Sequence, residues 1–443
     1  MKLMSATEHY LDQFNRVENQ LAGGDLPWLK QKREEALSRF AVMGFPKVGQ
    51  ETWKYTNVSS LEKKPFQLTP EQQNIINIEQ LLPFLLADDW PRIVFVDGFF
   101  KPELSKLSTL PEKIIVTSLA QVLKKDPKLV QDYLGHLSGE IQHGFAALNM
   151  ALMTDGAYIH LGKNSNIEQP IHLIFIATGA QEGQAHTLRN MIIAEENSCA
   201  SIIEHYIGLN NNSYFTNTIS EIFSHNKTQL THCKLQQESE QAFHIGTTQV
   251  KQSLDSHFNS FVFSFGGRLV RSDTNVALAE ENTHSNLTGL FLTRNKQHMD
   301  FHTCIDHKQP RGKSREFYKG ILTDQSRGVF NGKVIVHKDA QKTDADQHSK
   351  NLLLSRMAEI DTKPELEIYA DDVKCCHGAT VGQLDEDALF YLRARGIDRA
   401  TAINMLVYAF ASEMIGLIKA PLLQNYLQQL LVSLLRGKET LSE

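Results

Sequence analysis

The stretch VFNGKVIVH, residues 329–337, is rich in β-branched residues and contains the chain's only Asn-Gly pair, Asn331-Gly332. Apolar runs of similar length predict further strands, and helical periodicity is nearly absent between residues 155 and 375. These further runs lie at residues 172–177, 201–207, 261–265, 286–293 and 365–369. Many short strands in series suit either two stacked sheets or a parallel β-solenoid. Because no other Asn-Gly hairpin signal is present, the pattern favours the solenoid, although no exact sequence repeat is visible.

Helical patterns flank this strand-rich region on both sides. Ser5 and Glu8 have the spacing of a capping box, and a second N-terminal helix is expected to begin near Pro27. After the strand-rich region, Asp385 and Asp398 are each expected to cap a helix. A third apolar stripe follows near the C-terminus, so three terminal helices are predicted.

The domain organisation follows from this change of pattern. We expect an N-terminal helical region at residues 1–88, a β-helix core at 89–378 and a C-terminal helical region at 379–443. Three apolar helices at the end of a solenoid are expected to cap it, packing on each other and on the last rung. Alternatively, one of their apolar faces docks a partner protein.

The composition excludes several classes of protein. The formal net charge is -6, whereas a general nucleic-acid binder would show a basic stripe that neutralises phosphates. No run of 18 apolar residues is present, and the first residues lack the apolar core of a signal peptide. The 5 cysteines are odd in number and scattered, unlike a disulfide framework. We therefore expect a cytoplasmic protein with no nucleic-acid partner and no membrane span.

One candidate metal site lies at residues 298–307, HMDFHTCIDH. In a strand, the period of two places His298, Asp300, His302, Cys304 and Asp306 on one face. Imidazole, thiolate and carboxylate all bind metals, but same-face residues are roughly 6.6 Å apart, so one ion would reach only two of them. The pattern therefore fits the polar face of a half-buried strand better than a metal centre.

Motifs for nucleotide binding or hydrolysis are missing. Gly312-Lys313-Ser314 suggests a phosphate-binding loop, but that loop requires a glycine where His307 stands. The sequence therefore contains no recognisable nucleotide-binding motif, and we expect no nucleotide site in this chain. Acidic residues such as Asp344 and Asp346 resemble the carboxylates of β-solenoid polysaccharide enzymes, although unpaired surface acids are commoner.

The segment that ends the strand-rich region combines Cys375, Cys376 and His377. In an extended backbone, Cys375 and His377 project to one face and Cys376 to the other. The adjacent Lys374 is expected to favour the thiolate, which is the form that binds metal or carries sulfur. Two buried cysteines and a hydrogen-bonded histidine would show the same spacing, so both interpretations stay open.

The amino-acid sequence of this region resembles that of the SufD family of iron–sulfur cluster assembly proteins. The resemblance is carried by YADDVKC at 369–375, HGATVG at 377–382 and FYLRARGI at 390–397. Further matches stand at WKYT (53–56), YKG (318–320), VFNGK (329–333), AQKT (340–343) and NLLLS (351–355). They span almost the whole chain.

The resemblance implies a right-handed parallel β-helix core between two helical regions. It implies a SufB-like partner at the end of the β-helix and a SufC-like ATPase on the C-terminal helices. A transient iron–sulfur cluster or iron would be held at the interface with SufB, and the chain itself would be a scaffold and no enzyme. Whether a flavin binds, and whether the isolated chain forms a homodimer, stay open.

The family's Lys-Cys-Ser-His-Gly-Ala-Thr segment maps its histidine onto His377 and its cysteine onto Cys375. The resemblance implies that these two residues are the metal ligands. Cys376 replaces the family's serine. Two other hypotheses remain: a β-solenoid carbohydrate-active enzyme, and a stand-alone metalloprotein that uses residues 298–307.

Overall fold

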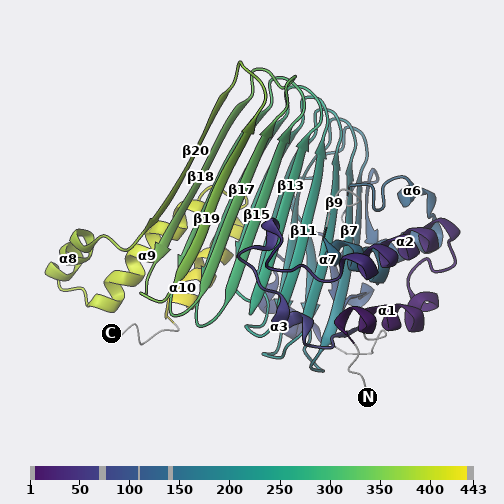
Figure 1. Cartoon of the computed structure of the whole chain (residues 1–443), viewed down its shortest axis with the longest axis horizontal. Helices are drawn as coiled ribbons and strands as arrows, with labels where there is room; N and C mark the ends of the chain where they lie inside the picture. The colour runs from purple at the N-terminus through teal and green to yellow at the C-terminus, as the bar shows by residue number, and fades with distance from the viewer. Residues whose placement is uncertain (1–4, 69–75, 108–109, 138–142, 437–443) are drawn as a thin grey trace.

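The strand-rich region forms a parallel β-solenoid in a computed structural model that describes residues 5–68, 76–107, 110–137 and 143–436 (Figure 1). Two ten-stranded sheets face each other, and from β5 onward successive strands along the chain alternate between them. Nearly all neighbouring strands are parallel; among the described strands, only the β2–β3 and β4–β5 pairs are antiparallel. The predicted mainly β solenoid, with helical regions at both ends, is confirmed.

Sheet A contains ten strands, and within it β1 pairs only with β7. Its strands are β1 (Gln67–Leu68), β4 (Ile114–Ser118), β5 (Ala157–Leu161), β7 (Gln184–Ala194), β9 (Phe215–Ser224), β11 (Phe243–Gln252), β13 (Leu269–Leu278), β15 (His298–His307), β17 (Arg327–Val336) and β19 (Glu359–Ile368). Strand β19 forms one edge of this sheet.

Sheet B has the same organisation, and β20 forms its edge beside β19. Its strands are β2 (Arg92–Val96), β3 (Phe99–Phe100), β6 (Ile171–Ala177), β8 (Cys199–Gly208), β10 (Gln229–Gln237), β12 (His257–Ser264), β14 (His284–Thr293), β16 (Lys313–Leu322), β18 (Asp344–Leu353) and β20 (Lys374–Gly382).

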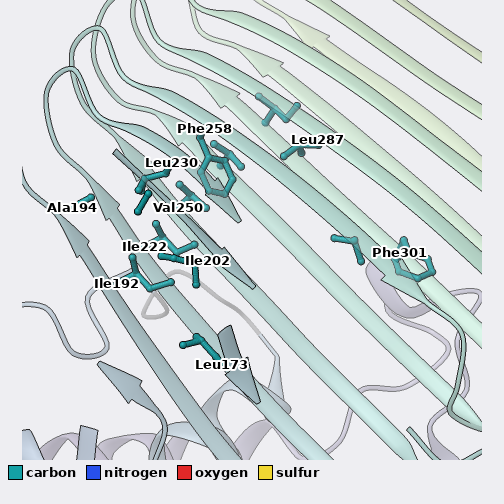
Figure 2. Close-up of a cluster of buried hydrophobic side chains, with 14 of the residues drawn as sticks. Leu173, Ile192, Ala194, Ile202, Ile222, Leu230, Val250, Phe258, Leu287 and Phe301 are labelled. Carbon is teal, nitrogen blue, oxygen red and sulfur yellow. The ribbon is translucent and has the colours of Figure 1, made fainter. Parts of the chain in front are cut away.

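The core of the solenoid is the space between the two sheets. Alternate side chains of each strand point inward, and Figure 2 shows such apolar side chains from both sheets meeting there. Aromatic rings extend this core toward β20: Phe291 and Phe301 stack at 4.8 Å between ring centres, as do Tyr318 and Phe330. Burial of these inward faces supplies the main free energy of folding.

Asn331-Gly332, which reads as a hairpin signal, lies inside strand β17. A side chain on Gly332 would approach the Gln347 amide nitrogen to 2.1 Å, so any larger residue there would displace the Gln347 side chain. The Asn-Gly pair therefore does not mark a turn.

One corner of the solenoid has the same backbone conformation in successive rungs, although no single residue type occupies it throughout. Positions on this corner have left-handed φ angles of 56° to 63°. They are Asn164, Asn197, Lys227, Asp255, Asn282, Arg311 and Lys342. Side chains link some rungs at this corner, as where the Asn197 amide donates to Asn164 at 2.8 Å and the Asn282 amide donates to Asp255 at 2.6 Å. These pairs are 33 and 27 residues apart, which gives the length of one turn of the solenoid.

The N-terminal helices cover the outer face of sheet A. They are α1 (Ala6–Val17), α2 (Pro27–Met43), α3 (Ser59–Glu62), α5 (Leu119–Lys125), α6 (Lys128–Gln131) and α7 (Gly144–Leu152), while α4 (Ile78–Leu81) packs near β2 and β6. The predicted capping box of Ser5 and Glu8 and the start of α2 at Pro27 are confirmed.

The predicted boundaries differ in two places from the elements observed. Helices α5, α6 and α7 lie within residues 89–378, which were predicted to form only the β-helix core. Their apolar side chains pack with those of the N-terminal helices on sheet A. Strand β20 continues to Gly382, so the position predicted as the end of the core, 378, falls inside a strand.

The C-terminal helices are α8 (Glu386–Ala394), α9 (Arg399–Ile415) and α10 (Pro421–Arg436), and Asp385 and Asp398 cap the first two as predicted. The expectation that they cap the solenoid's end is wrong. Helices α9 and α10 pack on the outer face of sheet B, where a row of apolar side chains including Phe263 and Leu290 meets Val407 and Leu427. None of the helices in the described ranges is long and apolar enough to cross a bilayer.

Candidate functional site

Strand β20 carries the cysteine–histidine segment at the edge of sheet B. Its pairing with β18 places Cys375 beside Ala345, Cys376 beside Asp346 and His377 beside Gln347. Ala345 and Gln347 are buried inside the solenoid. Cys375 and His377 therefore lie on the inward face and Cys376 on the outward face, as strand alternation predicted.

The inward face of β20 is open to solvent, because within the described chain no strand follows β20 in its sheet. His377 is exposed although Gln347, one rung earlier, is 0% exposed. Cys375 is half-buried and packs against the edge of the apolar core. The two predicted ligands thus stand at an uncovered end of the solenoid.

The Cys375 thiol is held in its neutral form. Burial raises its pKa, and the nearby Asp344 carboxylate acts in the same direction. Lys374 points outward, on the opposite face from Cys375, so the expectation that it favours the thiolate is wrong. Deprotonation of Cys375 would require a change at this end of the solenoid, such as metal binding, which favours the thiolate.

Cys376 is fixed on the outside of the solenoid. Its thiol donates to Asp346 Oδ1 at 3.0 Å, and His348 Nε2 lies 2.9 Å from the same oxygen. This hydrogen bond raises the pKa of the Cys376 thiol. The contacts separate Cys376 from the face that carries Cys375 and His377.

Two side chains cannot complete the coordination of an iron–sulfur cluster, which usually takes four cysteine thiolates. Within the described ranges, no group of three or more histidine, cysteine or acidic residues has the geometry to hold a metal ion. A cluster or iron handled at this end would therefore need ligands from elsewhere in addition to Cys375 and His377.

A buried polar row lies behind His377, on the inner face of sheet B. Gln347 is the neighbour of His377 on β18, and its amide donates to Glu316 on β16. Burial raises the pKa of the Glu316 carboxyl to about 7. The sequence analysis missed this residue; only its inward position in the strand register would have drawn attention to it.

Residues 298–307 form strand β15, and their alternation is as predicted: Met299, Phe301 and Ile305 join the inner core. Asp300 is buried and contacts Arg271 Nη1 at 2.6 Å and His302 Nε2 at 3.0 Å. The Arg271 guanidinium holds the pKa of Asp300 below its usual range against the effect of burial.

This face of β15 is therefore occupied by structural contacts. The hydroxyl of Thr56, in the N-terminal segment WKYT, also donates to Asp300. Burial raises the pKa of the Cys304 thiol to about 11. The polar face anchors the N-terminal region, which disfavours the stand-alone metalloprotein.

The suggested phosphate-binding loop and the acidic pair Asp344 and Asp346 also have structural roles. Lys313 and Ser314 begin strand β16, which continues to Leu322 and is not a loop that leads into a helix. Asp344 pairs with Arg315 at 3.0 Å, while Asp346 contacts Cys376 and His348. Neither the loop nor these carboxylates has the geometry of a nucleotide site or a paired acid centre.

Helices α9 and α8 differ in how they contact the solenoid. The Lys319 ammonium on β16, whose side chain is 1% exposed, pairs with Glu413 on α9 at 2.5 Å. Helix α8 packs against α9 and leaves Phe390 74% and Tyr391 56% exposed. An apolar surface on α8 is therefore available to a partner.

Comparison with known proteins gives a consistent result. The family model for "SUF system FeS cluster assembly, SufBD core domain" matches residues 175–410, and that for "SufBD protein N-terminal region" matches residues 4–173. An iron–sulfur cluster assembly SufBD family protein of Synechocystis is 33% identical over 410 residues, 90% of each chain. The iron–sulfur cluster assembly protein SufD of Escherichia coli is 32% identical over 388 residues, 86% of this chain and 87% of that one. SufD of Bacillus subtilis is 26% identical over 432 residues, 93% of this chain and 94% of that one.

Proposed function

Because the chain belongs to the SufBD family of SUF-system iron–sulfur cluster assembly proteins, we propose that it acts as a SufD-like subunit of a SufB–SufC–SufD complex. In this proposal it is a cytoplasmic scaffold without catalytic activity of its own. The observation that carries the proposal is the open end of the solenoid, where β20 presents Cys375 and His377.

The partner at this end is a SufB-like subunit. Strands β19 and β20 are edge strands with unpaired backbone groups, which are suited to pairing with strands of a second chain. Apolar side chains stand exposed beside them, with Tyr369 63% and Val381 48% exposed. The same surface would allow the isolated chain to pair with a second copy of itself.

His377 and Cys375 are the proposed ligands of iron or a transient cluster at this interface. Their shared inward face, together with the open end, allows a partner to supply the remaining ligands. Iron and sulfide are cargo in this scheme, so the site is completed only when the two subunits meet. A flavin site is not part of the proposal, because no residue described above supports one.

The C-terminal helices bind the SufC-like ATPase. Exposed Phe390 and Tyr391 on α8 give the apolar contact, while α9 and α10 are fixed on sheet B through Lys319 and the apolar row beneath them. ATP hydrolysis would then act through α8 and α9 on the solenoid. The chain needs this partner, since its own motifs hold no nucleotide.

Co-expression with SufB-like and SufC-like proteins of the same source, followed by affinity purification through this chain, tests the proposal. Ala379→Glu places a charge on the inward face of β20 and is expected to remove the SufB-like partner but retain the SufC-like one. Thr380→Glu, which points outward on the same strand, is the matched control and should retain both. Wild-type chain that captures neither partner would contradict the proposal.

A further inference from the structure

A long groove crosses the outer face of sheet B beside the C-terminal helices. Its volume of about 1040 Å³ is at the upper end of the range for pockets that hold organic ligands. Successive strands supply an apolar floor that includes Ile203, Cys233, Phe261 and Phe317. One wall is formed by residues 417–423, which run from the α9–α10 connection into the first turn of α10. The groove is on the outside of the solenoid, away from the inward face that carries Cys375 and His377.

The groove is elongated along the solenoid axis. Its lining runs from β8 to β18, which is five steps between neighbouring strands of sheet B. At about 4.8 Å a step, the floor is about 24 Å long. Trp90 and Pro170 line the end nearer the N-terminal rungs, and His348 and Lys350 line the other end.

Apolar side chains of the groove are open to water. Phe261 and Phe317 are only partly buried on the floor, and on the wall Leu417 is 48% and Leu422 45% exposed. Covering such surface with a hydrocarbon body is favourable, by roughly 25 cal/mol per Å² of apolar area removed from water. An occupant with a long apolar portion therefore fits the groove.

The charges in the lining give the groove a direction. At the β18 end, Arg315 is paired with Asp344 at 3.0 Å, and Asp346 contacts His348 at 2.9 Å. Lys350, at this end, and Lys419, on the wall, form no salt bridge in the part of the chain that the structure describes, and the Lys350 ammonium lies 5.4 Å from the centre of the Phe317 ring. The opposite end carries Glu168. A negatively charged group is therefore favoured at the β18 end and disfavoured beside Trp90.

We propose that this groove binds an elongated amphiphilic anion, such as a long-chain carboxylate. Its charged group lies at Lys350, and its hydrocarbon chain extends over Phe317 and Phe261 toward Trp90. Binding in this orientation buries the exposed apolar wall and places the anion beside an ammonium group that forms no salt bridge in the described part of the chain. The site is additional to the cluster-assembly role and does not depend on it.

Fluorescence of a dansyl-labelled undecanoate, displaced by dodecanoate or by dodecanol, tests this on the purified full chain. The two competitors share a hydrocarbon length and differ in charge. We expect both to displace the probe. Lys350→Glu should weaken dodecanoate about fivefold and change dodecanol less than about twofold, because only the charged end is affected.

Thr231→Trp fills the floor from a half-buried position on β10 and should weaken both competitors by roughly tenfold, with an unchanged melting temperature as proof of folding. Lys251→Glu, an exposed lysine on sheet A, is the charge control and should change neither. Failure of wild-type protein to bind the probe would overturn the proposal. Equal loss of dodecanoate and dodecanol on Lys350→Glu, or binding unaffected by Thr231→Trp, would overturn it too.

Discussion

Thr56 Oγ1 donates a 2.5 Å hydrogen bond to Asp300 Oδ2, although 244 residues separate the two in the chain. The same carboxylate pairs with Arg271, whose guanidinium lies 4.3 Å from the centre of the Trp53 ring. One buried carboxylate therefore joins the segment WKYT to sheet A, in addition to the β1–β7 pairing and the apolar contacts of the N-terminal helices. Removing one partner from such a group leaves the others desolvated and unpaired, which is costly.

Asp300→Ala is expected to lower the free energy of unfolding by about 3 kcal/mol, because Arg271 loses a buried partner and Thr56 its acceptor. Denaturant titration followed by circular dichroism measures the change. Asp361→Ala, two strands further along sheet A, is the control and should cost less than about 1 kcal/mol, since that carboxyl is only partly buried and unfavourably placed. Similar losses in the two variants would contradict the role given to Asp300.

Glu316 is expected to make stability depend on pH. Burial raises the pKa of its carboxyl from 4.5 to about 7, so between these values the folded chain binds more protons than the unfolded chain. Its contribution is fully present below about pH 4.5 and is lost as the pH rises through about 7. Glu316→Gln should therefore stabilise the protein at pH 8 by up to about 3 kcal/mol and leave it nearly unchanged at pH 4.

Thermal melts across this pH range measure the effect of Glu316→Gln. Glu112→Gln, which removes an exposed carboxyl, serves as the control. A Glu316→Gln protein whose melting temperature follows the wild-type profile would show that this carboxyl does not titrate as described.

His377→Ala is expected to reduce iron–sulfur cluster assembly by the complex by roughly tenfold or more, since it removes the ligand proposed for the subunit interface. Co-purification of the partners should be unchanged, because the imidazole is exposed in the free chain. Cluster content is read from absorbance and iron and sulfide analysis of the purified complex. Cys376→Ser, on the outward face, is the matched control and should assemble normally; full assembly by His377→Ala would rule out the proposed ligand.

Phe390→Asp is expected to remove the SufC-like ATPase from the purified complex and leave the SufB-like subunit bound. The ring is 74% exposed on α8, so its loss should change the melting temperature of the free chain very little. Val42→Asp, an 88% exposed position on α2, is the control at the opposite end. Retention of the ATPase by Phe390→Asp would show that α8 is not its docking surface.

Strand alternation and helix caps were the parts of this structure that local sequence patterns predicted. The period of two correctly separated Cys376 from Cys375 and His377, and it correctly placed Met299 and Phe301 in the core. Such patterns depend only on neighbouring residues, so they can be read without knowing what packs above them.

Other features depend on contacts between distant rungs and were not visible. Helix α7 is buried on every side, so it shows no amphipathic period. The corner that repeats in each rung is formed by residues as different as Asn282 and Arg311, because the backbone conformation is common to them and the side chain is not. The raised pKa of Glu316 likewise arises from burial by neighbouring strands.

The open edge formed by β19 and β20 has a consequence for local unfolding. Each turn of a solenoid is stabilised only by the turns beside it, so the terminal turn has half the neighbours of an interior one. Amide hydrogen exchange should therefore be fastest on β20, in the segment that carries Cys375 and His377. A subunit that adds its own strands to this edge orders the last turn as it binds, so ordering the ligand-bearing segment and recruiting the partner become a single cooperative event.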